Sequence, residues 1–151
     1  MTPAGERAAL FAFDDDHLER LAGDTTPCFA YRASVARASY ARLRKALPPR
    51  ARIAYAVKAN PNPELLRLFA GLGASFDCAS EGELRRVAGL QVGGGRTFFA
   101  GPGKRTAELE LALEQGVRVQ AEGWEDLERL DALARARGLS PVTVNLRVHP
   151  Q

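Results

Sequence analysis

The chain has 151 residues, of which 46% are apolar and 26% are charged, with a formal net charge of +3. This composition is typical of a soluble globular protein, and the length suffices for one domain with a good core. No apolar run approaches the roughly 20 residues of a membrane span. The acidic start, MTPAGERAALFAFDDDHLERL, lacks the basic and then apolar pattern of a signal peptide. We therefore expect a cytoplasmic protein.

The charges and the rare side chains exclude several classes of function. Arginines alternate with acids in LEQGVR and EDLERLDALARAR, which indicates solvated helix faces rather than a nucleic-acid-binding surface. Cys28, Cys78, His17 and His149 are too few and too scattered for a disulfide framework or a metal site. We expect Cys78 to be a small buried side chain, and we assign no role to His149.

The first predicted elements precede a repeating pattern. Residues 1–26 are acidic and irregular, and we expect a lead-in segment there. Residues 27–31 are a short strand candidate. Residues 32–47 have helical spacing and end at two prolines.

From residue 52 onward, strands and helices alternate. Asn62 is a good N-cap and Pro63 suits the first helical position, with Leu65, Leu68, Phe69 and Leu72 as the expected apolar face. We expect strands at 52–57, 75–79, 96–100, 117–121 and 141–148, and helices at 63–72, 80–88, 106–115 and 124–137.

This alternation predicts an α/β fold with a parallel sheet, whose strands we expect to be apolar on both faces. The period of 21 to 24 residues could also suit a leucine-rich solenoid, but no LxxLxL signature recurs. Two architectures remain: an open doubly wound sheet, and a barrel of eight strand–helix units, which takes about 250 residues. Five units fill this chain, so a barrel would be incomplete.

In parallel α/β folds the working residues lie at the carboxyl ends of the strands. Here these positions hold Lys58, Asp77 with Ser80, Gly101 to Lys104, Glu122, and Arg147 with His149. Lys58 stands out because the chain has three lysines against 18 arginines. Lysine can lose its proton and form a Schiff base, whereas arginine cannot. The alternative is a surface lysine with a packed stem.

One long segment carries a family resemblance. YAVKANPNPELLRLFAGLGASFDCASEGEL, residues 55–84, resembles the start of the barrel in fold-type III pyridoxal-phosphate enzymes, within the diaminopimelate, ornithine and arginine decarboxylase branch. The likeness continues through FFAGPGKRTAELELALEQGV to NLRVHP, and covers the chain from about Pro27. The related alanine racemases usually have AYGHG after the lysine, which is absent here. The resemblance therefore implies an alanine racemase-like TIM barrel, with residues 27–151 as part of its pyridoxal-phosphate-binding domain.

The resemblance also implies roles for four residues. Lys58 carries pyridoxal phosphate as a Schiff base, and Asp77 lies beside the cofactor. Glu83 lies near the cofactor, and Arg147, which we expect to be buried with an anionic partner, approaches its phenolic oxygen. The residues alone leave alternatives open: Asp77 as a turn or capping acid, and Glu83 as the second member of a capping box that starts at Ser80. Lys104 is a loop lysine, since GPGK lacks the phosphate-loop pattern.

Several family features have no counterpart in these residues: the glycine-rich phosphate loop, the glutamate facing the pyridine nitrogen, the stacking histidine and the second, β-rich domain. We therefore expect the N-terminal five of eight barrel units of a homodimeric amino-acid decarboxylase, inactive alone. Its substrate could be diaminopimelate, ornithine, lysine, arginine or a carrier-linked amino acid. The alternatives are a non-catalytic relative that binds a full-length decarboxylase, and another fold-type III enzyme such as a racemase.

Overall fold

The computed structural model describes residues 15–23, 27–139, 141–148 and 150. The chain divides into two compact units, Met1–Pro49 and Arg50–Gln151. His149 and most of the predicted lead-in segment lie outside the described residues. None of the described helices is both long and apolar enough to cross a bilayer.

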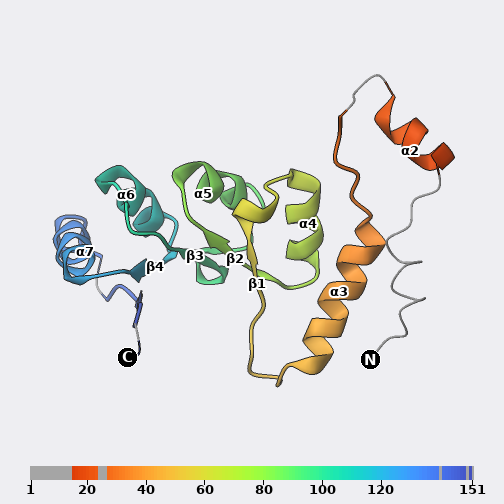
Figure 1. The fold of residues 1–151 in the computed structure, drawn as a ribbon. Coiled ribbons are helices and arrows are strands. Elements are labelled where there is room, and N and C mark those ends of the chain that lie inside the picture. The colour runs from red at the N-terminus through yellow and green to blue at the C-terminus, as the bar shows by residue number, and fades with distance from the viewer. Residues whose placement is uncertain (1–14, 24–26, 140, 149, 151) are drawn as a thin grey trace. The chain divides into compact units, whose positions relative to one another are not determined.

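Within its described residues, 15–23 and 27–49, the first unit contains helices α2 (Asp15–Ala22) and α3 (Ala33–Ala46) (Figure 1). Helix α3 confirms the helix predicted over residues 32–47, and it ends just before Pro48, which cannot continue a helix. The strand predicted over residues 27–31 is wrong, because this segment has no regular structure. Phe29 is 91% exposed, so the apolar residues that suggested a strand are not buried.

The second unit contains every strand and helix predicted after residue 52, with shorter strands. The strands are β1 (Ala54–Ala56), β2 (Ser75–Cys78), β3 (Thr97–Phe99), β4 (Arg118–Ala121) and β5 (Val144–Leu146). The helices are α4 (Pro63–Gly71), α5 (Glu81–Ala88), α6 (Thr106–Glu114) and α7 (Trp124–Ala136), with short 3-10 turns η1 (Val57–Ala59) and η2 (Gly94–Arg96).

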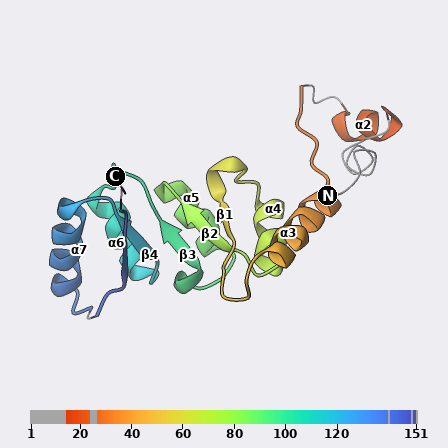
Figure 2. The same cartoon turned by 60° about the horizontal axis from the view of Figure 1, so that its bottom comes forward.

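The order of the strands decides between the two expected architectures. All five strands are parallel, and they lie side by side in the order β1-β2-β3-β4-β5. Helices α4 to α7 follow the same order (Figures 1 and 2). A doubly wound sheet reverses its strand order at a switch point, whereas a barrel adds each strand beside the last. The fold is therefore five consecutive strand–helix units in the arrangement of a barrel.

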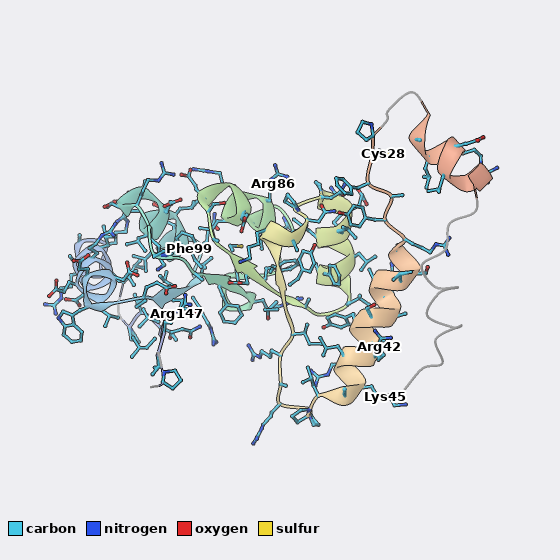
Figure 3. All side chains as sticks on the ribbon, in the orientation of Figure 1. Cys28, Arg42, Lys45, Arg86, Phe99 and Arg147 are labelled. Atoms are coloured by element: carbon cyan, nitrogen blue, oxygen red, sulfur yellow. The ribbon has the colours of Figure 1, made fainter. Side chains whose placement is uncertain are left out.

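The core lies between the sheet and its helices. Phe76, Cys78, Phe99 and Val119 are at most 1% exposed and form one cluster with residues from α4 to α7 (Figure 3 labels Phe99). Successive strand side chains point to opposite faces, and those between the core residues are only partly buried. This second face includes Asp77, Phe98, Arg118, Gln120 and Asn145. The expectation of strands that are apolar on both faces is therefore wrong.

Helix α4 has the predicted start and stop but a different buried face. The Asn62 side chain accepts a hydrogen bond from the Glu64 amide at 2.8 Å, and Gly73 follows the helix with φ of 87°. Leu66 is the fully buried residue of α4, while Leu65 is only partly buried. The buried stripe therefore differs from the predicted one at Leu66, while Phe69 of the predicted face packs against the core cluster.

Candidate active site

Lys58 lies in the 3-10 turn η1, directly after β1, and its side chain is exposed. The preceding residue, Val57, has 0% exposure and belongs to the core cluster. The backbone is thus anchored in the core one residue before the lysine. This arrangement presents a primary amine just after the carboxyl end of β1, as the sequence predicts.

The segment that follows Lys58 is held by three hydrogen bonds. Tyr55 Oη donates to the Asn60 carbonyl at 3.0 Å, and Asn60 Oδ1 accepts from the Asn62 amide at 2.9 Å. Arg86, which is labelled in Figure 3, donates from α5 to the Pro61 carbonyl at 3.2 Å. The turn is therefore fixed to its own strand and to a neighbouring helix.

Asp77 lies on the strand next to the lysine. It pairs in register with Ala56, two residues before Lys58, and is partly buried. Burial raises the pKa of Asp77 above its usual value of 3.8, and the positive charge of Lys58 opposes that rise. The structure thus brings Lys58 and Asp77 within electrostatic range of each other, as expected from their neighbouring strand ends.

Glu83 caps the start of α5. The Ser80 hydroxyl accepts from the Glu83 amide at 3.4 Å, while Glu83 Oε2 accepts from the Ala79 amide at 2.8 Å. The capping interpretation is therefore confirmed, although the carboxylate reaches one residue beyond the usual target. This bond fixes the Glu83 carboxylate at the end of β2, the strand that holds Asp77.

The pKa of Cys78 is affected by burial and by two nearby carboxylates. The thiol is fully buried, which confirms the expected small buried side chain. Burial, followed by the negative charges of Glu83 and Asp77, raises its pKa to about 12. Both carboxylates are therefore close enough to the end of β2 to act on the Cys78 thiol.

Arg147 differs from its prediction. It follows β5, and its side chain is 47% exposed rather than buried, because it extends to Glu122 instead of into the core. Its Nη1 lies 2.9 Å from Glu122 Oε2, which provides the expected anionic partner. Strand β5 is at the opposite edge of the five strands from β1, so the structure does not bring Arg147 together with Lys58.

Glu122 links two strand ends. One carboxylate oxygen accepts from the Gly101 amide at 3.0 Å, and the other accepts from Arg147. The bond from Gly101 lowers the pKa of Glu122 against a smaller effect of burial, and Arg147 lowers it further. The sequence predicts Glu122 at a strand end but indicates no role for it. Its position directly after β4 was the available signal.

The loop lysine is buried, which the sequence does not reveal. The side chain of Lys104 is 1% exposed, and its Nζ donates to Asp126 Oδ2 at 2.8 Å and to the Gly101 carbonyl at 2.6 Å. Burial alone would raise the pKa of Asp126, but bonds from Lys104 and from the Glu122 amide lower it. Lys104 is therefore an ion-paired structural cation.

Comparison with known proteins identifies the family. The profile described as the pyridoxal binding domain of pyridoxal-dependent decarboxylases matches residues 32–151. The chain belongs to this family. The resemblance predicted from residues 55–84 is thus confirmed, and so is the barrel-type fold of the decarboxylases it resembles.

Individual relatives give the extent of the match. The diaminopimelate decarboxylase of Pseudomonas aeruginosa is 40% identical over 129 residues, which cover 83% of this chain and 30% of that protein. The lysine/ornithine decarboxylase of Selenomonas ruminantium is 39% identical over 110 residues, or 73% of this chain and 27% of the relative. The crystal structure of Helicobacter pylori diaminopimelate decarboxylase complexed with L-lysine superposes with a TM-score of 0.79 at 27% identity, covering 87% of this chain and 34% of that one. The chain spans about a quarter to a third of the length of these decarboxylases.

Proposed function

We propose that this chain is the cofactor-anchoring part of a pyridoxal-phosphate-dependent amino-acid decarboxylase, and that Lys58 binds the cofactor covalently. The observation that carries the proposal is the place of Lys58: an exposed amine at the carboxyl end of β1, beside a partly buried carboxylate, in a pyridoxal-binding domain. A primary amine that reaches solvent can attack the cofactor aldehyde.

The other two lysines fit the cofactor less well. Lys104 is enclosed and paired with Asp126, so its amine is not accessible to the cofactor aldehyde. Lys45 lies in the last turn of α3, in the other compact unit. Lys58 is the lysine that combines an open position with a strand end in the barrel. When bound there, pyridoxal phosphate supplies a ring that takes up the electron pair left by departing carbon dioxide.

Three further residues have proposed roles toward the cofactor. The Asp77 carboxylate adjusts the charge around Lys58, with which it interacts electrostatically. Glu83 adds a second carboxylate, held by its bond to the Ala79 amide. Arg147 presents a half-exposed guanidinium held by Glu122, and we assign it to the phenolic oxygen of the cofactor.

We propose a basic amino acid as the substrate, with diaminopimelate, lysine, ornithine and arginine as the candidates and a carrier-linked amino acid as a further one. The relatives carry the names diaminopimelate decarboxylase and lysine/ornithine decarboxylase. We further propose that the whole enzyme works as a homodimer in the cytoplasm.

Covalent trapping tests the proposed anchor. The chain is incubated with pyridoxal phosphate, the adduct is reduced with borohydride, and modified peptides are quantified by mass spectrometry. We expect the label on Lys58 in preference to Lys45, and loss of that label in Lys58→Arg, which keeps the positive charge. Lys45→Arg is the matched control and should leave the Lys58 label unchanged. Equal labelling of Lys45 and Lys58 would contradict the proposal.

Turnover tests the remaining part of the proposal. We expect the 151 residues alone to release little or no carbon dioxide from the four candidate amino acids, because the chain covers about a quarter to a third of its relatives. Clear turnover would contradict this expectation. A non-catalytic relative would show no preference for Lys58 in the trapping experiment, and a racemase would interconvert enantiomers instead of releasing carbon dioxide.

A further inference from the structure

The turn that carries Lys58 is closed by a hydrogen bond across its base. Strand β1 ends at Ala56, the turn η1 follows, and Lys58 is its middle residue. Tyr55 and Asn60 flank this turn, and the Tyr55 hydroxyl donates to the Asn60 carbonyl at 3.0 Å. The bond therefore joins the chain just before the lysine to the chain just after it.

Tyr55 is itself fixed from the helix side of the sheet. Its ring stacks on Phe69 of α4, with ring centroids 4.3 Å apart and an angle of 20° between the planes. In the sheet it pairs with Phe76, which is fully buried in the core. A tyrosine held between a helix and a strand gives the turn a rigid point of attachment.

Asn60, which accepts the bond from Tyr55, is also linked to the start of α4. Asn60 uses its side chain to accept from the Asn62 amide, and Asn62 caps α4. The bond from Tyr55 therefore links Asn60 to β1, and the side chain of Asn60 links the same segment to the N-cap of α4. Without it, the segment from residue 57 to residue 60 would lose a side-chain link to β1 and would keep the anchor that buried Val57 provides.

We propose that Tyr55 is the positioning residue of Lys58, setting the direction in which the lysine leaves β1. The inference rests on the proposed function, because it concerns how the cofactor-binding amine is presented. Tyr55 acts through the turn, since its ring packs toward the helices while Lys58 is exposed. Positioning of a reacting group within a fixed frame accelerates its reaction with a bound partner.

Tyr55→Phe tests the proposal, because it removes the hydroxyl and keeps the ring that stacks on Phe69. In the labelling step the Lys58 nitrogen bonds to the aldehyde carbon of pyridoxal phosphate and water leaves. Borohydride then reduces the carbon–nitrogen double bond to a stable amine. The initial rate of labelling is measured at each of the three lysines. Lys45 serves as the exposed reference, and Lys104 reports on an intact core because its side chain is buried.

We expect labelling of Lys58 to slow by about three- to tenfold, the effect of losing one hydrogen bond. Labelling of Lys45 and Lys104 should not change, and Tyr31→Phe, which alters an exposed tyrosine of the other unit, should leave all three rates unchanged. An unchanged Lys58 rate in Tyr55→Phe would overturn the inference alone. Increased labelling of Lys104 would overturn it in favour of a general loss of structure. A wild-type chain without preference for Lys58 would overturn the proposed function and this inference with it.

Discussion

The Lys104 ammonium lies 2.8 Å from the Asp126 carboxylate, and the two side chains are only 1% and 9% exposed. The pair joins the loop after β3 to the first turn of α7. The cost of burying both charges is offset because each has a second partner, the Gly101 carbonyl for the lysine and the Glu122 amide for the aspartate.

Removing one member of this pair should destabilise the fold strongly. Asp126→Ala leaves the Lys104 charge buried and unpaired, which we expect to lower the free energy of unfolding by about 3 kcal/mol. Asp131→Ala is the control, since its pair with Arg135 is exposed and should contribute about 0–1 kcal/mol. Urea unfolding measures both. Similar losses in the two variants would contradict a structural role for the buried pair.

Asp77 and Glu122 should affect stability with opposite dependence on pH. The folded pKa of Asp77 is raised above 3.8, so the folded state holds its proton more tightly and loses stability as pH rises through that shifted pKa. Asp77→Asn should therefore gain stability relative to the wild type over the same rise. The folded pKa of Glu122 is lowered below 4.5, so its contribution is present above that value and is lost in acid. Glu122→Gln should accordingly lose stability relative to the wild type as pH rises.

Thermal unfolding at a series of pH values between about 3 and 7 provides the measurement for this pair of variants. The slopes of the two difference curves should have opposite signs. Curves with the same sign would contradict the pKa directions derived from the two environments.

The two cysteines should differ in reactivity toward iodoacetamide. Cys28 is exposed, whereas Cys78 is buried and its pKa is about 12. Because the thiolate is the reacting form, we expect the folded chain at pH 8 to be alkylated at Cys28 alone. Cys28→Ser should then remain unlabelled until urea is added. Labelling of Cys78 in the folded chain would show that the end of β2 opens.

Two glycines of the same loop provide a matched test of backbone strain. Gly101 has φ of 114°, a region that side chains disfavour, whereas Gly103 has no such angle and open space beside it. We expect Gly101→Ala to lower the free energy of unfolding by about 1–3 kcal/mol. Gly103→Ala should stay within about 0.5 kcal/mol of the wild type. Equal effects in denaturant titrations would mean that the loop adjusts its conformation around residue 101.

Much of the fold follows from local signals in the sequence. Asn62 and Pro63 predict the start of α4, and Ser80 predicts the start of α5, because capping depends on neighbouring residues. Local signals give the wrong prediction for the segment at residues 27–31. Its apolar residues match a strand, but a strand also needs a partner, and local sequence does not encode one.

The candidate site is predictable where it depends on strand ends and not where it depends on side-chain partners. Lys58, Asp77 and Glu83 occupy ends of adjacent strands or the following helix start, so their proximity follows from the parallel sheet. The burial of Lys104 and the exposure of Arg147 depend on Asp126 and Glu122, which are 22 and 25 residues away in the sequence. Sequence spacing alone does not indicate which acid meets which base.

The sequential order of the strands also affects how the second unit can assemble. Each strand pairs with the one synthesised just before it, so paired residues are only about 20 to 25 positions apart. Loops of this length cost little entropy to close, and contacts between nearby residues favour rapid folding. The sheet can therefore grow strand by strand as the chain leaves the ribosome, in the same order in which it is translated.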